Sequence, residues 1–166
     1  VEQVTPRATE PDERPLAELA DRDWIAALAI ETGIPDRALR AYAGAAIRVA
    51  EEQPACGLGW NTLAAIGHVE SEHGTIQGES IGPDGRTPTP IVGIALDGAV
   101  TDAIRDTDDG ALDGDTVWDR AVGPMQFIPE SWREWGASAD GADGDAGDPS
   151  HIDDAAPAAA RYPRPV

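Results

Sequence analysis

The sequence contains no lysine and a single cysteine, Cys56, among 166 residues. One cysteine excludes an internal disulfide framework and a multi-cysteine zinc site. No run of about 18 apolar residues occurs, so no segment is expected to span a membrane. The first residues also lack the basic-then-apolar order of a signal peptide. They are therefore compatible with an intracellular protein, or with a chain whose leader peptide has been removed.

Positive charge is scarce as well: 12 arginines face 31 acidic residues, which gives a formal net charge of −19. Nucleic-acid phosphates and anionic membrane surfaces both need clustered cations, so neither is an expected partner. The acidity suits a protein that meets neutral or cationic polymers, or one whose surface charge simply keeps it soluble. With 41% hydrophobic residues, the chain is rich enough in apolar side chains to form one packed domain.

Apolar residues recur mainly at helical spacing, and no ladder of alternating strands stands out, so the sequence predicts a mainly α fold. The expected domain covers residues 20–162, between a flexible, acidic, proline-containing tail (1–19) and an atypical end (163–166). Helices are expected from Asp21 or Asp23 to Gly33, from Pro35 to Pro54, over 60–73, over 99–105, after Pro129 and over 150–162, where Pro157 should interrupt the last one.

The helix expected over 60–73 has the most informative pattern. At about 100° per residue, one arc collects Leu63, Ile66, Gly67 and Val69. Glu70 falls inside this arc and His73 lies on it, whereas Glu72 points away. A carboxyl group on an apolar face loses water, which raises its pKa and lets it donate a proton to a leaving oxygen. A glutamate at the edge of the core, paired with an arginine, is the alternative interpretation of Glu70.

Other chemistry-bearing residues give weaker signals. His73 could line a pocket or satisfy a hydrogen bond in the core. The Gly/Asp loop over 137–149 does not fit the EF-hand spacing, because the position that needs glycine holds Asp148 when the count starts at Asp143. A looser calcium site in that loop stays open beside a simply solvated loop. Cys56 lies in a Pro/Gly turn with no nucleophile signature around it.

Four segments occur in a recognisable order: AAIGHVESEHG (64–74), IVGIALDG (91–98), IRDTDDGALDGDTVWDRAVGPMQFIPESW (104–132) and DPSHIDDAAPAAARY (148–162). Together they resemble the lytic murein transglycosylase B-like family, in the version found in actinobacteria. The resemblance covers roughly residues 20–162. The combination of the Glu-Ser pair with the acidic run and GPMQFIP downstream makes the resemblance specific.

The resemblance implies a lysozyme-like helical fold with a long groove for peptidoglycan strands, and action at the cell envelope or outside the cell. Glu70 matches the family's single catalytic glutamate, and Gln126 matches the hydrogen-bonding residue of the groove motif. The remaining residues expected to bind substrate are Ser71, His73, Met125, Phe127 and Tyr162. No cofactor or metal is implied, and a monomer is expected.

The resemblance also implies that Glu70 cleaves the bond between N-acetylmuramic acid and N-acetylglucosamine and leaves a 1,6-anhydro end. A hydrolytic muramidase, a weak or inactive peptidoglycan-binding remnant and an acidic calcium-binding module are the alternatives. The remnant is considered because the chain departs from the family pattern at its end. Pro157 replaces a leucine, and the family's cysteine partner for Cys56 is absent from the sequence.

Overall fold

The computed structural model describes residues 14–141 and 144–162, and it is mainly helical over these residues, as the sequence predicts. The described part contains no β-strand, only isolated bridges between loop segments. No helix in it is long and apolar enough to cross a membrane. The elements are a 3₁₀ turn η1 (Leu16–Glu18) and the helices α1 (Arg22–Thr32), α2 (Asp36–Glu52), α3 (Trp60–Ser71), α4 (Pro129–Trp135) and α5 (Ile152–Arg161).

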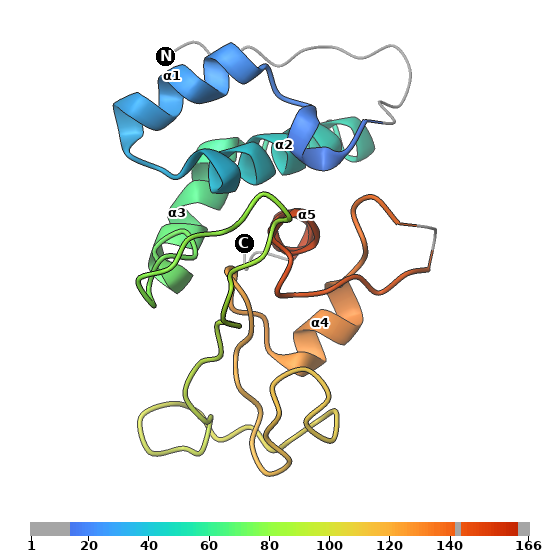
Figure 1. Ribbon diagram of the computed structural model, residues 1–166. Helices are drawn as coiled ribbons and strands as arrows, with labels where there is room; N and C mark the ends of the chain where they lie inside the picture. The colour runs from blue at the N-terminus through green and yellow to red at the C-terminus, as the bar shows by residue number, and fades with distance from the viewer. Residues whose placement is uncertain (1–13, 142–143, 163–166) are drawn as a thin grey trace.

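Helix α2 is the centre of the fold, because it packs against η1, α1, α3 and α5. Figure 1 shows α1 lying across α2 on the outer side, while α5 lies on the opposite side of α2. The non-helical chain between α3 and α4 first runs beside α3 and α5 and then extends away from the helices as a group of loops. The proposed catalytic glutamate and its groove motif therefore come from the two ends of this loop region.

Local signals begin and end the first helices as the sequence predicts. The Asp21 carboxylate accepts the Trp24 N–H at 2.8 Å and so caps α1. Gly33 ends this helix in the left-handed conformation, at φ 74°, which glycine adopts without steric cost. Pro35 then precedes α2 directly, and Pro129 begins α4, positions at which the missing N–H of proline costs little.

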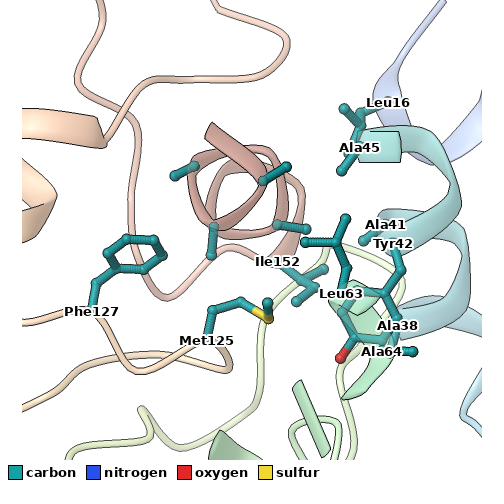
Figure 2. Packing of buried hydrophobic residues seen from close by; sticks show 14 of the residues in the cluster. Leu16, Ala38, Ala41, Tyr42, Ala45, Leu63, Ala64, Met125, Phe127 and Ile152 are labelled. Atoms are coloured by element: carbon teal, nitrogen blue, oxygen red, sulfur yellow. The ribbon is translucent and has the colours of Figure 1, made fainter. Parts of the chain in front are cut away.

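The core joins α2, α3 and α5 to the loop that precedes α4 (Figure 2). Ile152 and the alanines of α5 fill its centre, and their small side chains let α5 lie close to α2. Leu16 also belongs to this core with 0% of its surface exposed, and Leu19 is 5% exposed. The prediction of a flexible tail over 1–19 is therefore wrong for its last residues. Residues 1–13 and the predicted end 163–166 lie outside the described residues.

Pro157 does not interrupt the last helix: α5 runs from Ile152 to Arg161 with Pro157 inside it. Proline cannot donate a hydrogen bond to the carbonyl four residues back, at Asp153. Pro157 is buried, and the burial of its apolar ring offsets part of that loss. An apolar ring in the core can therefore keep a helix continuous where sequence propensity predicts a break.

The expected helix over 99–105 is also absent. Instead, Ile104 donates its N–H to the Leu96 carbonyl at 2.8 Å and accepts from Asp119 N–H at 3.1 Å. Gly98, at φ 85°, turns the chain between these contacts. Isolated bridges pair this segment with residues on both sides of it, Ala103 with Asp97 and Arg105 with Trp118. These contacts between loop segments override its short helical pattern.

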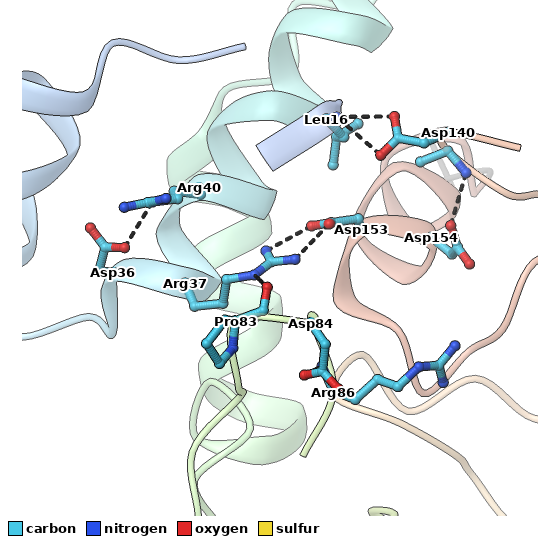
Figure 3. A network of polar contacts seen from close by, with 11 residues as sticks. Leu16, Asp36, Arg37, Arg40, Pro83, Asp84, Arg86, Asp140, Asp153 and Asp154 are labelled. Carbon is cyan, nitrogen blue, oxygen red and sulfur yellow. Dashed lines mark hydrogen bonds and ion pairs between the residues drawn. The ribbon is translucent and has the colours of Figure 1, made fainter. Parts of the chain in front are cut away.

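A largely buried ion pair joins α2 to α5, and its arginine also bonds to the loop that follows α3 (Figure 3). Arg37 of α2 donates to both carboxylate oxygens of Asp153 on α5, at 2.8 and 2.6 Å. Its Nε also donates to the Pro83 carbonyl at 3.3 Å. Arg86 forms a second ion pair with Asp148. One arginine thus joins two helices and the loop that follows α3.

Candidate active site

Helix α3 ends at Ser71, two residues earlier than predicted, in a left-handed turn. Glu72, His73 and Gly74 have φ values of 52°, 60° and 81° in succession. The Glu72 N–H bonds to the His68 carbonyl at 3.0 Å, and the His73 N–H bonds to the Gly67 carbonyl at 2.9 Å. These bonds cap carbonyls that would otherwise lack partners at the helix end. Non-glycine residues rarely adopt this conformation, so sequence propensity gave no sign of it.

Glu70 lies at the edge of the buried side of α3. The helix buries Leu63, Ala64, Gly67 and Ser71, and Glu70 is exposed beside this stripe. Val69, predicted to share the inner arc, is 79% exposed, so that part of the prediction is wrong. The buried stripe is therefore narrower than the predicted arc, and Gly67 lies within it, against Tyr42 of α2.

The Glu70 carboxyl group has no ion pair or hydrogen bond with any described residue. The alternative of a structural glutamate paired with an arginine is therefore not supported among residues 14–141 and 144–162. Loss of surrounding water raises the pKa of Glu70 above its ordinary value of 4.5. Such a group holds its proton to a higher pH than a solvated glutamate, as a general acid must.

Ser71, predicted to bind substrate, is completely buried, with 0% of its surface exposed. Its hydroxyl donates to the Pro124 carbonyl at 2.7 Å and accepts from the Gly74 N–H at 2.8 Å. Ser71 therefore cannot touch a substrate, and that prediction is corrected. Its hydroxyl instead ties the end of α3, which carries Glu70, to the loop that carries Met125, Gln126 and Phe127.

Residues 125–127, the segment expected to line a substrate groove, are mostly buried. Met125 is 4% exposed and Phe127 is 7% exposed, and both belong to the main core (Figure 2). The Phe127 ring packs edge-on against Trp132, with ring centroids 5.2 Å apart. The prediction that Met125 and Phe127 contact substrate is therefore corrected, because their side chains support the loop from below.

Gln126 is the member of the motif that remains partly exposed. Val122 and Phe127 exchange two backbone hydrogen bonds, at 2.8 and 3.1 Å, and so close a tight loop around it. Gln126 has φ 51°, and its Nε2 donates to the Gly123 carbonyl at 3.0 Å. A non-glycine residue in this conformation is held there by its surroundings, and here the hydrogen bond from the side chain to Gly123 contributes to that hold.

His73 satisfies a hydrogen bond in the interior, the second of the two roles the sequence allows. Its Nδ1 lies 3.3 Å from the hydroxyl of Tyr42, a residue with 0% exposure. Its ring is also 5.3 Å from that of His68. Burial, and then the charge of His68, lower the pKa of His73. The neutral ring fits its place against the buried tyrosine.

Tyr162, just after α5, is 45% exposed, and its ring contacts Phe127 of the loop that contains Gln126. Its ring lies 6.2 Å from Phe127 and 6.0 Å from Trp135, and its hydroxyl is 3.4 Å from Ser131 Oγ. Tyr162 is thus linked to the motif through Phe127. Within residues 14–141 and 144–162, no hydrogen bond or ring contact joins it to Glu70.

The acidic loops use their carboxylates locally. In the 137–149 loop, Asp140 accepts the Leu16 N–H, and Asp148 pairs with Arg86; Asp143 lies outside the described residues. The described carboxylates close enough together to hold a metal ion are elsewhere, at Asp106, Asp108 and Asp119. These oxygens already accept backbone N–H groups or the Thr107 hydroxyl. No metal is therefore assigned to them.

A pocket of about 540 Å³ lies between α2, α5 and the end of α4, away from Glu70. None of the predicted site residues lines it. Its walls include Leu16, Arg48, Glu52, Trp135, Pro157 and Arg161. Cys56 is also remote from any site, as an exposed free thiol in the turn before α3.

No family model, curated protein or solved structure matches this chain. The site is therefore interpreted from its own residues. The Ser71 hydroxyl bonds the end of α3, which carries Glu70, to the Pro124 carbonyl, two residues before Gln126. The structure assigns supporting positions to Ser71, His73, Met125 and Phe127.

Proposed function

We propose that this protein is a lytic transglycosylase that cleaves peptidoglycan strands, with Glu70 as its catalytic acid and base. The observation that carries the proposal is the unpaired, partly desolvated Glu70 carboxyl on a helix end that Ser71 ties to the loop of Gln126. A glycosidase needs a carboxyl group that is protonated near neutral pH and a hydrogen-bonding partner for the sugar. Glu70, whose pKa is raised by loss of surrounding water, is proposed as the acid, and Gln126 is proposed as the hydrogen-bonding partner of the sugar.

In the first step, protonated Glu70 donates its proton to the glycosidic oxygen between N-acetylmuramic acid and N-acetylglucosamine. The C1–O bond breaks, and the N-acetylglucosamine side leaves as a hydroxyl. The acetamido group of the muramic acid stabilises the positive charge at C1, as in other substrate-assisted glycosidases. In the second step, the Glu70 carboxylate takes the proton from the C6 hydroxyl of the same sugar, and that oxygen attacks C1. The product is a 1,6-anhydro ring, and the proton returns to Glu70.

The proposed mechanism uses one carboxyl group, and the acetamido group of the substrate takes the place of a second carboxylate at C1. Loss of surrounding water raises the pKa of Glu70, which suits its role as the proton donor.

The experiment that tests the proposal compares Glu70→Gln with Glu72→Gln on purified peptidoglycan. Glu72 is one residue beyond the end of α3, exposed, and carries the same charge. We expect Glu70→Gln to lose cleavage while keeping its fold, and Glu72→Gln to cleave normally. Mass spectrometry then separates anhydro ends from the reducing ends of a hydrolytic muramidase. Glycan binding by the wild type without any product would indicate an inactive remnant. Since the substrate lies in the wall, we also propose that the protein acts at the cell envelope or outside the cell.

A further inference from the structure

Arg120 lies at the end of the acidic segment 106–120, just before the loop 122–127 that contains Gln126. It donates three hydrogen bonds to other residues. Its backbone N–H donates to Asp113 Oδ2 at 2.6 Å, and its Nε donates to Asp115 Oδ2 at 2.9 Å. Its remaining described bond reaches across to another segment, where the guanidinium donates to the Gly93 carbonyl at 3.2 Å. The two aspartates therefore fix the arginine, and the arginine fixes the backbone at Gly93.

Gly93 in turn lies against the side chain of Gln126. Its N–H donates to the Ala121 carbonyl at 2.8 Å, so the segment is bonded on both of its polar groups. A Cβ at Gly93 would stand 3.0 Å from Gln126 Oε1, which is closer than ordinary packing allows. Because Gly93 has no side chain, the Gln126 amide can pack directly against its Cα. Moving Gly93 would move the surface against which this amide packs.

The arginine is suited to this role by its geometry and its surroundings. Its side chain is 32% exposed, and that of Asp115 is 19% exposed, so water screens their contact only in part. The N–H groups of Val117 and Trp118, followed by Arg120, hold the pKa of Asp115 below its usual range. A planar guanidinium can bond a carboxylate and a carbonyl at once, whereas a lysine ammonium lacks this fixed fork.

We propose that Arg120 is a positioning residue that fixes the Gln126 side chain, which lies against Gly93, by holding the Gly93 backbone in place. Asp113 and Asp115 accept hydrogen bonds from Arg120 and hold it in place, so these two carboxylates of the segment 106–120 also help to position Gln126. The proposal rests on the proposed function, in which Gln126 hydrogen-bonds the glycan. It adds that binding depends on a residue that does not itself touch substrate.

The experiment compares Arg120→Ala and Arg120→Lys with Arg105→Ala, a control that removes the same charge from the same loop. Arg105 stacks over Trp118, with the guanidinium carbon 3.9 Å from the ring centroid. We expect both Arg120 variants to shift the NMR signals of the Gln126 side-chain NH₂, and Arg105→Ala to leave them in place. On peptidoglycan we expect Arg120→Ala to raise KM about tenfold, with a smaller change in kcat.

A double-mutant cycle shows whether Arg120 acts through Gln126. Adding Arg120→Ala to Gln126→Ala should cost little beyond Gln126→Ala alone, because residues in one network are not additive. Gly93→Ala, which displaces the amide directly, should reproduce the NMR shift and keeps the test valid if Arg120→Ala fails to fold. An unchanged Gln126 signal in Arg120→Lys, or fully additive losses in the cycle, would overturn the proposal. The NMR result is decisive even if the wild type fails to cleave peptidoglycan, so the two proposals fail separately.

Discussion

Gly67 is the position where α3 meets Tyr42 of α2, and its replacement by alanine tests how this contact places Glu70. A Cβ at Gly67 would overlap the Tyr42 hydroxyl and stand 2.7 Å from its Cζ. Tyr42 has 0% exposure, so its ring has no open space to enter. Gly67→Ala must therefore push α3 away from α2. Because Glu70 follows by three residues on the same helix, its carboxyl group would move as well.

Two effects of opposite sign decide the outcome for stability. In a helix interior, alanine is favoured over glycine by about 1 kcal/mol. Overpacking a core costs about 1–3 kcal/mol, and an overlap with a fully buried ring belongs at the upper end. We therefore expect Gly67→Ala to lower the free energy of unfolding by about 2 kcal/mol, the difference between about 3 and about 1. A displacement of about 1 Å can reduce activity by about 100-fold, so we expect a loss of kcat/KM of up to that size.

Urea unfolding and peptidoglycan cleavage measure the two effects. Ala65→Gly, at an exposed position of the same helix, measures propensity alone and should cost about 1 kcal/mol. Adding Tyr42→Phe to Gly67→Ala removes the nearest clashing atom and should restore part of the stability. If Gly67→Ala were instead more stable than the wild type by about 1 kcal/mol and fully active, the reasoning would be refuted.

Three further predictions concern stability and charge. Ser71→Ala leaves the Pro124 carbonyl without its buried donor and should lower the free energy of unfolding by about 1–3 kcal/mol in urea melts. Asp153→Ala leaves Arg37 largely buried and unpaired, and should cost about 3–5 kcal/mol by the same assay. The Glu70 carboxyl carbon should titrate by NMR with a midpoint above 4.5. Since its pKa is raised in the folded state, Glu70 adds stability at acid pH that disappears as the pH rises through the folded-state pKa.

Matched variants show whether these effects are specific. Thr75→Ala removes an exposed hydroxyl bonded to the Glu72 carbonyl, and should change stability by less than about 0.5 kcal/mol. Glu52→Gln weakens the more exposed pair with Arg161, and should cost at most about 1 kcal/mol. If Ser71→Ala lost no more free energy of unfolding than Thr75→Ala, the role given to Ser71 would be contradicted. An equal loss for Asp153→Ala and Glu52→Gln would contradict the role given to Asp153. A Glu70 midpoint at or below 4.5 would contradict its desolvation.

The sequence predicted what depends on neighbouring residues. The cap at Asp21, the stop at Gly33 and the helix starts after Pro35 and at Pro129 are all confirmed. Each follows from the conformation or the hydrogen bonding of one or two residues. The mainly α class follows in the same way from helical spacing. The same spacing placed Glu70 inside the apolar arc, whereas the structure leaves it exposed beside the buried stripe.

The remaining features depend on contacts between distant segments, which spacing does not reveal. Ser71 is buried because Pro124, far along the chain, accepts its hydroxyl. Leu16 belongs to the core because η1 packs on α2, and Pro157 stays helical because α5 is surrounded. The Arg120–Gly93 contact gave no sequence signal, since it joins two segments that lie 27 residues apart in the sequence. Tertiary packing therefore decided which predicted site residues face solvent and which support them.

Product analysis of peptidoglycan digested by the wild type and by Glu70→Gln tests the central claim most directly. The account predicts 1,6-anhydro-muramic ends with the wild-type protein and none with Glu70→Gln, while both proteins unfold at similar urea concentrations. Anhydro products from a folded Glu70→Gln variant would contradict the claim that this carboxyl group performs the reaction.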